Sequence, residues 1–137
     1  MSAQEQIYPP VTSELAEKRG SLAPKPAEAF KAFSRSVFDE GALSAKTKHL
    51  IAVAVAHVTQ CPYCIRGHTH AAVQHNGTAE EIMEAIWVAA EMRAGAAYAH
   101  SVIALDTIGA TEQRTRDPEK GGWFRSDVRE QNVRSAK

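Results

Sequence analysis

The sequence has only two cysteines among its 137 residues, no long apolar run and no excess of either charge. Two cysteines are too few for a disulfide-stapled secreted scaffold. Sixteen basic and sixteen acidic residues give zero net charge, so the field that concentrates nucleic acid or anionic lipid is missing. No run approaches the roughly 20 apolar residues of a membrane span, and the first ten residues lack a signal-peptide pattern. We therefore expect a cytoplasmic protein without nucleic-acid or membrane partners.

The length suits one domain with a single core. Residues 1–26 hold four prolines and few apolar positions, which predicts an extended N-terminal arm. Residues 27–110 carry the regular apolar pattern and are predicted to form a helical domain. Residues 111–137 are polar and charged apart from Trp123-Phe124, which predicts a loosely docked C-terminal tail.

Apolar spacing in the central part of the chain predicts helices and no strand. Phenylalanines recur near helical spacing from Ala27 to Glu40, and Gly41 ends the pattern as a C-terminal glycine often does. Ser44 is placed to cap a second helix. The run Leu50–Val58 in that helix is apolar on every face, which is typical of a buried helix.

A third helix is predicted to begin at the cysteine pair. Cys61 stands at the N-cap position, Pro62 at the favoured first helical position, and Asn76-Gly77 supplies a stop signal.

A long fourth helix is predicted from about Ala79 to Ile108. Thr78 and Glu81 fit a capping box at its start. Its second half is rich in alanine and glycine, which lets another backbone approach closely, as in a tight core or a subunit interface. The chain is therefore predicted to be all-α.

The Cys61-x-x-Cys64 pair at a helix start points to redox chemistry. A thiol acts as a nucleophile or ligand only as the thiolate, and the free amides and dipole at a helix N-terminus favour that anion. His68 follows Cys64 by four residues, which places imidazole and sulfur on one helical face. Either sulfur can also capture the other as a disulfide. The pattern indicates a dithiol poised for oxidation.

Other histidines are candidates for the same site. His49 and His57 precede Cys61 by multiples of four, so both face the dithiol if one helix runs unbroken through Pro62. If it does not, His57 is a hydrogen-bonded core histidine and His49 a partly solvated one. We expect His70 and His75 on the exposed face of the short helix.

Zinc is the alternative occupant for two thiols and several histidines. Structural zinc sites use two well-separated ligand pairs, whereas Cys61, Cys64 and His68 fall within eight residues of one helix. We therefore predict no metal site and no cofactor.

Residues 27–108, and above all the stretch KTKHLIAVAVAHVTQCPYCIRGHTHAA, resemble the alkylhydroperoxidase D/carboxymuconolactone decarboxylase-like superfamily. The motif Cys-x-x-Cys-x-x-x-His is met in full by Cys61, Cys64 and His68. The resemblance implies an all-helical, alkylhydroperoxidase D-like fold with a helical hairpin core, assembled as a homotrimer or homohexamer. It also implies thiol-dependent reduction of a peroxide, reset by an external dithiol reductant.

In the peroxidase members of the superfamily the second cysteine attacks and the first resolves, which implies these roles for Cys64 and Cys61, with His68 as base. Two positions depart from the pattern. His49 stands where those members usually carry the first glutamate of a proton relay, and Tyr63 where a histidine is common. A histidine can also accept and pass a proton near neutral pH, so His49 is kept as a candidate relay residue.

Glu91 is the candidate substitute acid. It follows Trp87 by one helical turn and precedes Tyr98 by two, so the three can share a face of the long helix. Its alternative is a solvated or salt-bridged carboxylate.

Three other functions stay open beside a peroxidase. One is a disulfide reductase or thiol oxidoreductase acting on a protein partner. Another is a carboxymuconolactone decarboxylase-like enzyme, although that branch works without a redox dithiol and both cysteines are present here. The third is a non-catalytic redox- or metal-sensing oligomer.

Overall fold

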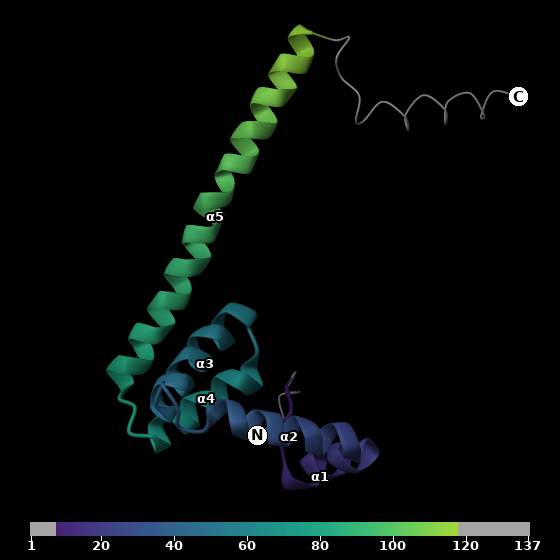
Figure 1. Cartoon of the computed structure of the whole chain (residues 1–137), viewed down its shortest axis with the longest axis vertical. Helices are drawn as coiled ribbons and strands as arrows, with labels where there is room; N and C mark the ends of the chain where they lie inside the picture. Colours follow the sequence, from purple (N-terminus) through teal and green to yellow (C-terminus); the bar gives the residue numbers. More distant parts are fainter. Residues whose placement is uncertain (1–7, 118–137) are drawn as a thin grey trace, which may run out of the picture. The chain divides into compact units, whose positions relative to one another are not determined.

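Between residues 8 and 117 the chain folds into five helices joined by short connections (Figure 1). The computed structural model describes residues 8–117, and no strand occurs among them. The all-α prediction is confirmed. The helices are α1 (Ser13–Leu22), α2 (Pro24–Phe38), α3 (Ala45–Thr59), α4 (Pro62–Gln74) and α5 (Ala79–Arg116). None of the helices in the described part of the chain is long and apolar enough to cross a membrane.

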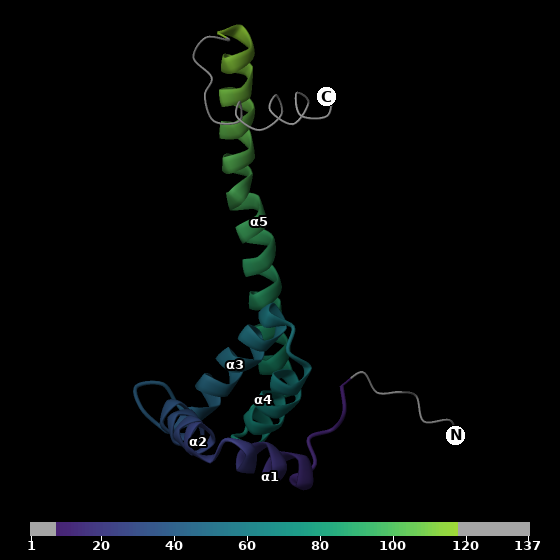
Figure 2. The ribbon, with the colours of Figure 1, turned by 90° about the vertical axis from the view of Figure 1, so that its right-hand side faces the viewer.

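Two compact units divide the chain after Arg93, within α5, and each is described by itself. The core of the first unit is a hairpin in which α3 and α4 pack side by side (Figure 2). Val53 on α3 and Ala72 on α4 are fully buried, and Ala56 on α3 is almost so. Small side chains at these positions let the two helices approach closely.

The turn of the hairpin follows from three consecutive residues. Gln60 ends α3 in the left-handed conformation, with φ 56°. Cys61 then caps α4, and Pro62 occupies a first-turn position, where its missing N–H costs no helical hydrogen bond. The predicted start of this helix at the dithiol is confirmed.

The end of α4 uses the predicted Asn76-Gly77 signal. Asn76 adopts a left-handed conformation with φ 62°, and the Gly77 amide donates a 2.8 Å hydrogen bond to the Ala72 carbonyl. A Cβ atom at position 77 would lie only 2.8 Å from that same oxygen, so glycine is required there.

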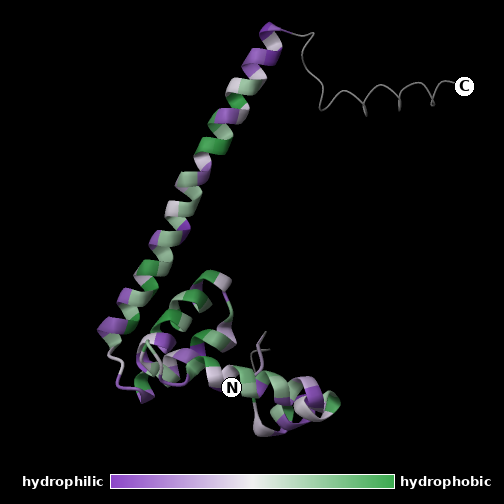
Figure 3. Cartoon of the chain, viewed as in Figure 1, coloured by the Kyte–Doolittle hydropathy of each residue, from purple (hydrophilic) through white to green (hydrophobic). Residues whose placement is uncertain are grey.

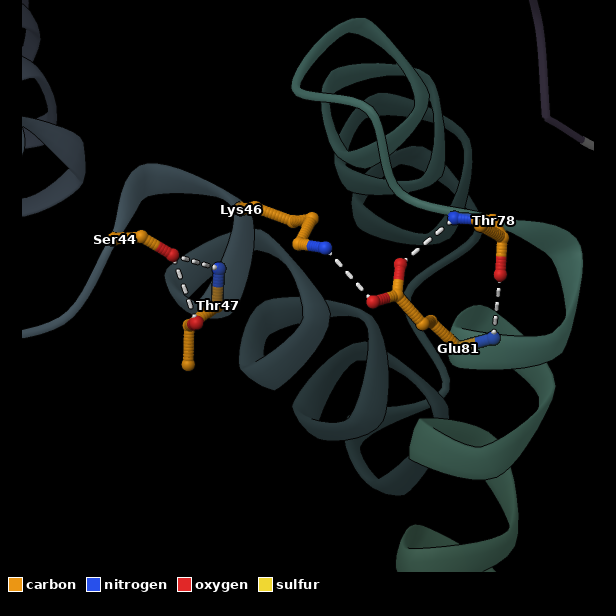
Figure 4. Close-up of polar contacts among 5 residues, drawn as sticks. All are labelled: Ser44, Lys46, Thr47, Thr78 and Glu81. Atoms are coloured by element: carbon orange, nitrogen blue, oxygen red, sulfur yellow. Dashed lines mark hydrogen bonds and ion pairs between the residues drawn. The ribbon is translucent and has the colours of Figure 1, made fainter.

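Two predicted N-caps are confirmed, and an ion pair links them (Figure 4). The Ser44 hydroxyl accepts a hydrogen bond from the Thr47 amide at 3.1 Å. Thr78 and Glu81 form the capping box, with the Thr78 amide donating to the Glu81 carboxylate at 2.9 Å and the Glu81 amide to the Thr78 hydroxyl at 3.2 Å. The Lys46 ammonium donates to the same carboxylate at 2.8 Å, which ties the start of α5 to α3.

The predicted extended arm over residues 1–26 is wrong for most of the described part of that segment. Helix α1 occupies Ser13–Leu22, and the Thr12 hydroxyl caps it by accepting from the Leu15 amide at 3.2 Å. Pro24 begins α2, three residues before the predicted start. The prolines that suggested an arm stand before α1 or in the first turn of α2, where they are tolerated.

The long helix also exceeds its predicted end. It continues from Ile108 to Arg116, so the predicted boundary at residue 110 lies inside a helix. The rest of the predicted tail, with Trp123, lies outside the described residues. Within the second unit hydrophobic residues alternate with hydrophilic ones along α5 (Figure 3), and Tyr98 and Val102 are 83% and 66% exposed.

Helix α3 is less buried than its sequence suggests. It buries one face, which includes His49, Val53 and Ala56, whereas Ile51 and Val55 on the opposite face are about half exposed. The expectation of burial on every face is therefore wrong for the described chain.

Candidate redox site

The two thiols meet at the N-terminus of α4. Cys61 has an extended backbone at the N-cap, and its sulfur accepts a hydrogen bond from the Cys64 amide at 3.3 Å. The two sulfur atoms lie 2.7 Å apart, and both cysteines are free. Cys61 is half-buried and Cys64 is exposed, so solvent reaches the pair.

The hydrogen bonds distribute charge unequally over the pair. They lower the pKa of Cys61, first through the Cys64 thiol and then through the Cys64 amide; desolvation opposes them, and the Tyr63 amide adds the smallest contribution. The same thiol contact raises the pKa of Cys64, together with desolvation and repulsion by the Cys61 charge. The first negative charge of the pair therefore falls on Cys61, whose sulfur also accepts the Cys64 amide.

Two histidines pair in the interior of the hairpin. His49 on α3 and His68 on α4 bring their Nδ1 atoms to 3.2 Å. One Nδ1 must carry the proton and the other accept it, so the acceptor ring is neutral. The Phe38 ring stacks on His49 with centroids 4.6 Å apart and also contacts His68 at 4.8 Å. His49 is only 8% exposed.

Burial makes the charged forms of both imidazoles unfavourable. It is the main cause that lowers the pKa of His49, with smaller contributions from the charges of His68 and His75. Burial also lowers the pKa of His68. The pair is thus neutral at neutral pH, and a neutral imidazole pair can take up and release a proton.

The predicted site residues therefore fall into two groups. Cys61 and Cys64 are in contact, and so are His49 and His68. Within residues 8–117 no hydrogen bond joins either thiol to an imidazole, although His68 lies one helical turn beyond Cys64.

His57 does not join either group. Its Nδ1 donates to the Val53 carbonyl at 2.8 Å, so the hydrogen bond of the alternative is present, but the side chain is half-buried and not part of the core. The left-handed turn at Gln60 breaks the helical register that would have aligned His57 with Cys61.

Two residues at the histidine pair were not predicted for the site. One is Phe38, whose only sequence signal is its place as the last apolar residue of the first predicted helix. The other is His75, which is exposed as expected but whose ring stacks on His49 with centroids 5.2 Å apart. His75 follows His68 by seven residues, which is two helical turns, and this spacing is the signal that could have placed it on the same face as His68.

Tyr63 and Glu91 take no part in a relay in this structure. The Tyr63 hydroxyl donates to the Pro9 carbonyl at 3.0 Å, and its ring meets Tyr8 edge-on at 6.1 Å. Tyr63 thus fixes the segment before α1 against the start of α4. Glu91 is exposed, and among the described residues it makes no hydrogen bond or ion pair.

No cluster of three or more metal-ligating side chains is arranged to hold a metal ion in the part of the chain from Tyr8 to Asp117.

The sequence matches the Carboxymuconolactone decarboxylase family over residues 24–107. A protein of Paracoccus denitrificans, "Uncharacterized protein 4 in cox locus", is 67% identical over 81 residues, which cover 59% of this chain and 73% of that protein. A solved structure from Methanobacterium thermoautotrophicum is 37% identical with a TM-score of 0.58, covering 61% of this chain and 94% of that one. A carboxymuconolactone decarboxylase family protein from Legionella pneumophila is 36% identical with a TM-score of 0.54, covering 58% of this chain and 70% of that one. This chain belongs to the carboxymuconolactone decarboxylase family, and its helices form the alkylhydroperoxidase D-like fold.

Proposed function

We propose that the chain is a thiol peroxidase that reduces hydrogen peroxide or organic hydroperoxides through the dithiol of Cys61 and Cys64. One observation carries the proposal: the Cys61 sulfur accepts the Cys64 amide at the start of α4, and the Cys64 sulfur lies 2.7 Å away. The amide stabilises a nucleophilic thiolate, and the neighbouring thiol is within reach to resolve the oxidised product.

The reaction runs in two covalent steps and one reduction. The thiolate attacks the terminal peroxide oxygen, so that an S–O bond forms, the O–O bond breaks, and the alkoxide leaves and takes a proton as an alcohol. The second thiol attacks the resulting sulfenic acid, which forms the disulfide and releases water. An external dithiol then reduces the disulfide and is itself oxidised.

Our proposed order of attack follows the hydrogen bonds. The resemblance implies that Cys64 attacks and Cys61 resolves, whereas the contacts of this chain stabilise the thiolate of Cys61. We therefore assign the attack to Cys61 and resolution to Cys64. His68, with His49 behind it, is the proposed base that takes the proton of the attacking thiol and then returns it to the leaving alkoxide, since a neutral imidazole can accept a proton near neutral pH.

The active form is proposed to be a homotrimer or homohexamer. In the second unit Tyr98, Val102, Ile103 and Leu105 are all at least 63% exposed. A helix that exposes this much apolar surface is stabilised by a partner that covers it. Association of identical subunits is the simplest source of such cover.

The first test is consumption of hydrogen peroxide and an alkyl hydroperoxide with dithiothreitol as reductant. Wild type should turn over both peroxides, and Cys61→Ser and Cys64→Ser should each lose dithiol-dependent turnover. His68→Ala should slow it, and His70→Ala, a matched change at an exposed position of the same helix, should not. A wild type that forms its disulfide yet consumes no peroxide would contradict the proposal.

A disulfide reductase acting on a protein partner is the second candidate. In this function Cys64 would be the attacking sulfur, because a protein disulfide is larger than a peroxide and needs an accessible thiol, and Cys64 is more exposed than Cys61. Reduction of insulin disulfides without turnover of either peroxide would establish this function in place of the first.

A further inference from the structure

An apolar groove lies against Tyr63, the residue that precedes Cys64, and no part of the proposed cycle has used it. The segment before α1, helix α1 and Tyr63 enclose a groove of about 490 Å³, whose lining includes Pro10, Val11, Leu15 and Arg19. That volume lies within the range of about 300–1,000 Å³ that is usual for small-molecule sites.

A second hollow of about 350 Å³ continues the first. The two share Pro10, Val11 and Tyr63, and the second adds Arg66 and Gly67 on α4. Tyr63 lies between the two cysteines in the sequence, within the first turn of α4. The joint groove therefore runs from α1 to the helix start that carries the thiols.

The charge of the groove is of one sign. Arg19 lines the larger hollow and Arg66 the smaller, and no acidic residue lines either. Within the described chain neither guanidinium is engaged in a hydrogen bond or an ion pair. A free guanidinium at the edge of an apolar surface suits a carboxylate, which it can bind through two parallel hydrogen bonds.

Contacts within the chain fix the wall of the groove. The hydrogen bond from the Tyr63 hydroxyl to the Pro9 carbonyl, at 3.0 Å, and the edge-on contact with Tyr8 fix its wall. Adjacent prolines add stiffness, since each has a fixed φ angle. A pre-formed site loses less conformational entropy when a ligand binds.

We propose that this groove binds a fatty-acid hydroperoxide, with the acyl chain along Val11, Leu15 and Tyr63 and the carboxylate at Arg19. The proposal rests on the peroxidase function and names its preferred substrate class. The O–O group would reach the dithiol beyond Tyr63. Attack by the thiolate forms the S–O bond and breaks the O–O bond, and the hydroxy fatty acid leaves with one proton.

Kinetics with a matched substrate pair tests the proposal on the full-length chain. Linoleic acid hydroperoxide carries a charged carboxylate, which its methyl ester replaces by a neutral group. The two are compared below their critical micelle concentrations. Arg19→Gln should lower kcat/KM for the acid about tenfold, the loss of one charge-assisted contact, with hydrogen peroxide and the ester changed less than twofold. Arg35→Gln is the control, because Arg35 on α2 pairs with Glu28 and lines neither hollow. An equal loss for acid and ester, or no loss for either, would overturn the proposal.

A binding measurement separates this proposal from the peroxidase function. Dodecanoate and methyl dodecanoate are titrated into wild type and Arg19→Gln by calorimetry. If dodecanoate binds and Arg19→Gln weakens that binding while no peroxide is consumed, the groove stands and the peroxidase proposal fails. If hydrogen peroxide is consumed but wild type binds dodecanoate no better than the ester, the groove proposal is wrong and the peroxidase proposal stands.

Discussion

The cysteine pair and the histidine pair occupy the same helical hairpin, yet their surroundings act on charge in opposite ways. At the start of α4 a backbone amide and a neighbouring thiol stabilise the negative charge of Cys61. Between α3 and α4, burial against Phe38 disfavours the positive charge of His49 and His68. A thiol attacks in its charged form, whereas an imidazole must be neutral before it can accept a proton as a general base. The difference shows how one hairpin can prepare both by solvent exposure and amide placement alone.

Trapping of the sulfenic acid should give the largest contrast within the cysteine pair. With one equivalent of peroxide, Cys64→Ser should form a stable sulfenic acid at Cys61, because the attacking thiolate remains and the resolving thiol is gone. Cys61→Ser should form almost none. Mass spectrometry after dimedone labelling measures both, and dominant labelling of Cys64 in Cys61→Ser would reverse the proposed order.

Removal of the His68 imidazole tests whether the histidine pair serves the cysteines. His68→Ala should lower kcat/KM for peroxide by about a hundredfold, the lower end of what general acid–base catalysis contributes. The pH dependence of the remaining activity should lose its histidine component, which a purely structural role would not predict. Unchanged kinetics would show that the cysteine pair does not depend on the histidine pair for catalysis.

Removal of the Phe38 ring should expose the histidine pair to water and so make its surroundings more like those of the exposed cysteine pair. Phe38→Ala removes the ring that stacks on His49 and should lower the free energy of unfolding by about 2 kcal/mol. It should also raise the pKa of His49, followed by NMR titration, since desolvation is the main cause of its depression. Phe30→Ala is the control, because Phe30 is 69% exposed; an equal effect there would show that Phe38 has no special role.

A smaller effect is expected on stability as a function of pH. The pKa values of His49 and His68 are lowered from 6.5 in the folded chain, so below about pH 6.5 the unfolded chain binds more protons. Stability should therefore fall as the pH drops from 6.5 towards the depressed values and be insensitive to these groups above it. Urea unfolding at pH 7.5 and 5.5 measures this, and His49→Gln should flatten the dependence. A wild type that is more stable at pH 5.5 would contradict the burial argument.

Local signals in the sequence predicted most of the hairpin. Ser44, Cys61-Pro62 and Thr78 each mark a helix start by hydrogen bonds within a few residues, and such signals do not depend on tertiary packing. The helix α1 was missed because prolines at its flanks and at the start of α2 suit an extended chain as well as a first turn.

The site was predicted in its residues but not in its contacts. His49 was named for its distance from Cys61, whereas its partner is His68, because the turn at Gln60 folds α4 back onto α3. The role of Phe38 depends on the packing of α2 beside that hairpin, which no local pattern encodes. The order of the two thiol pKa values depends on one amide hydrogen bond and one thiol contact, both of which only the folded helix end provides.

The alkylation rate of each cysteine of the reduced protein, measured as a function of pH, tests most directly whether Cys61 is the nucleophile. Iodoacetamide reacts with the thiolate, and mass spectrometry of the digested protein separates Cys61 from Cys64. We expect Cys61 to be modified first, with an apparent pKa below that of an ordinary cysteine, and Cys64 to titrate above the ordinary value. Modification of Cys64 first, with Cys61 at or above the ordinary value, would contradict the assignment of Cys61 as the nucleophile.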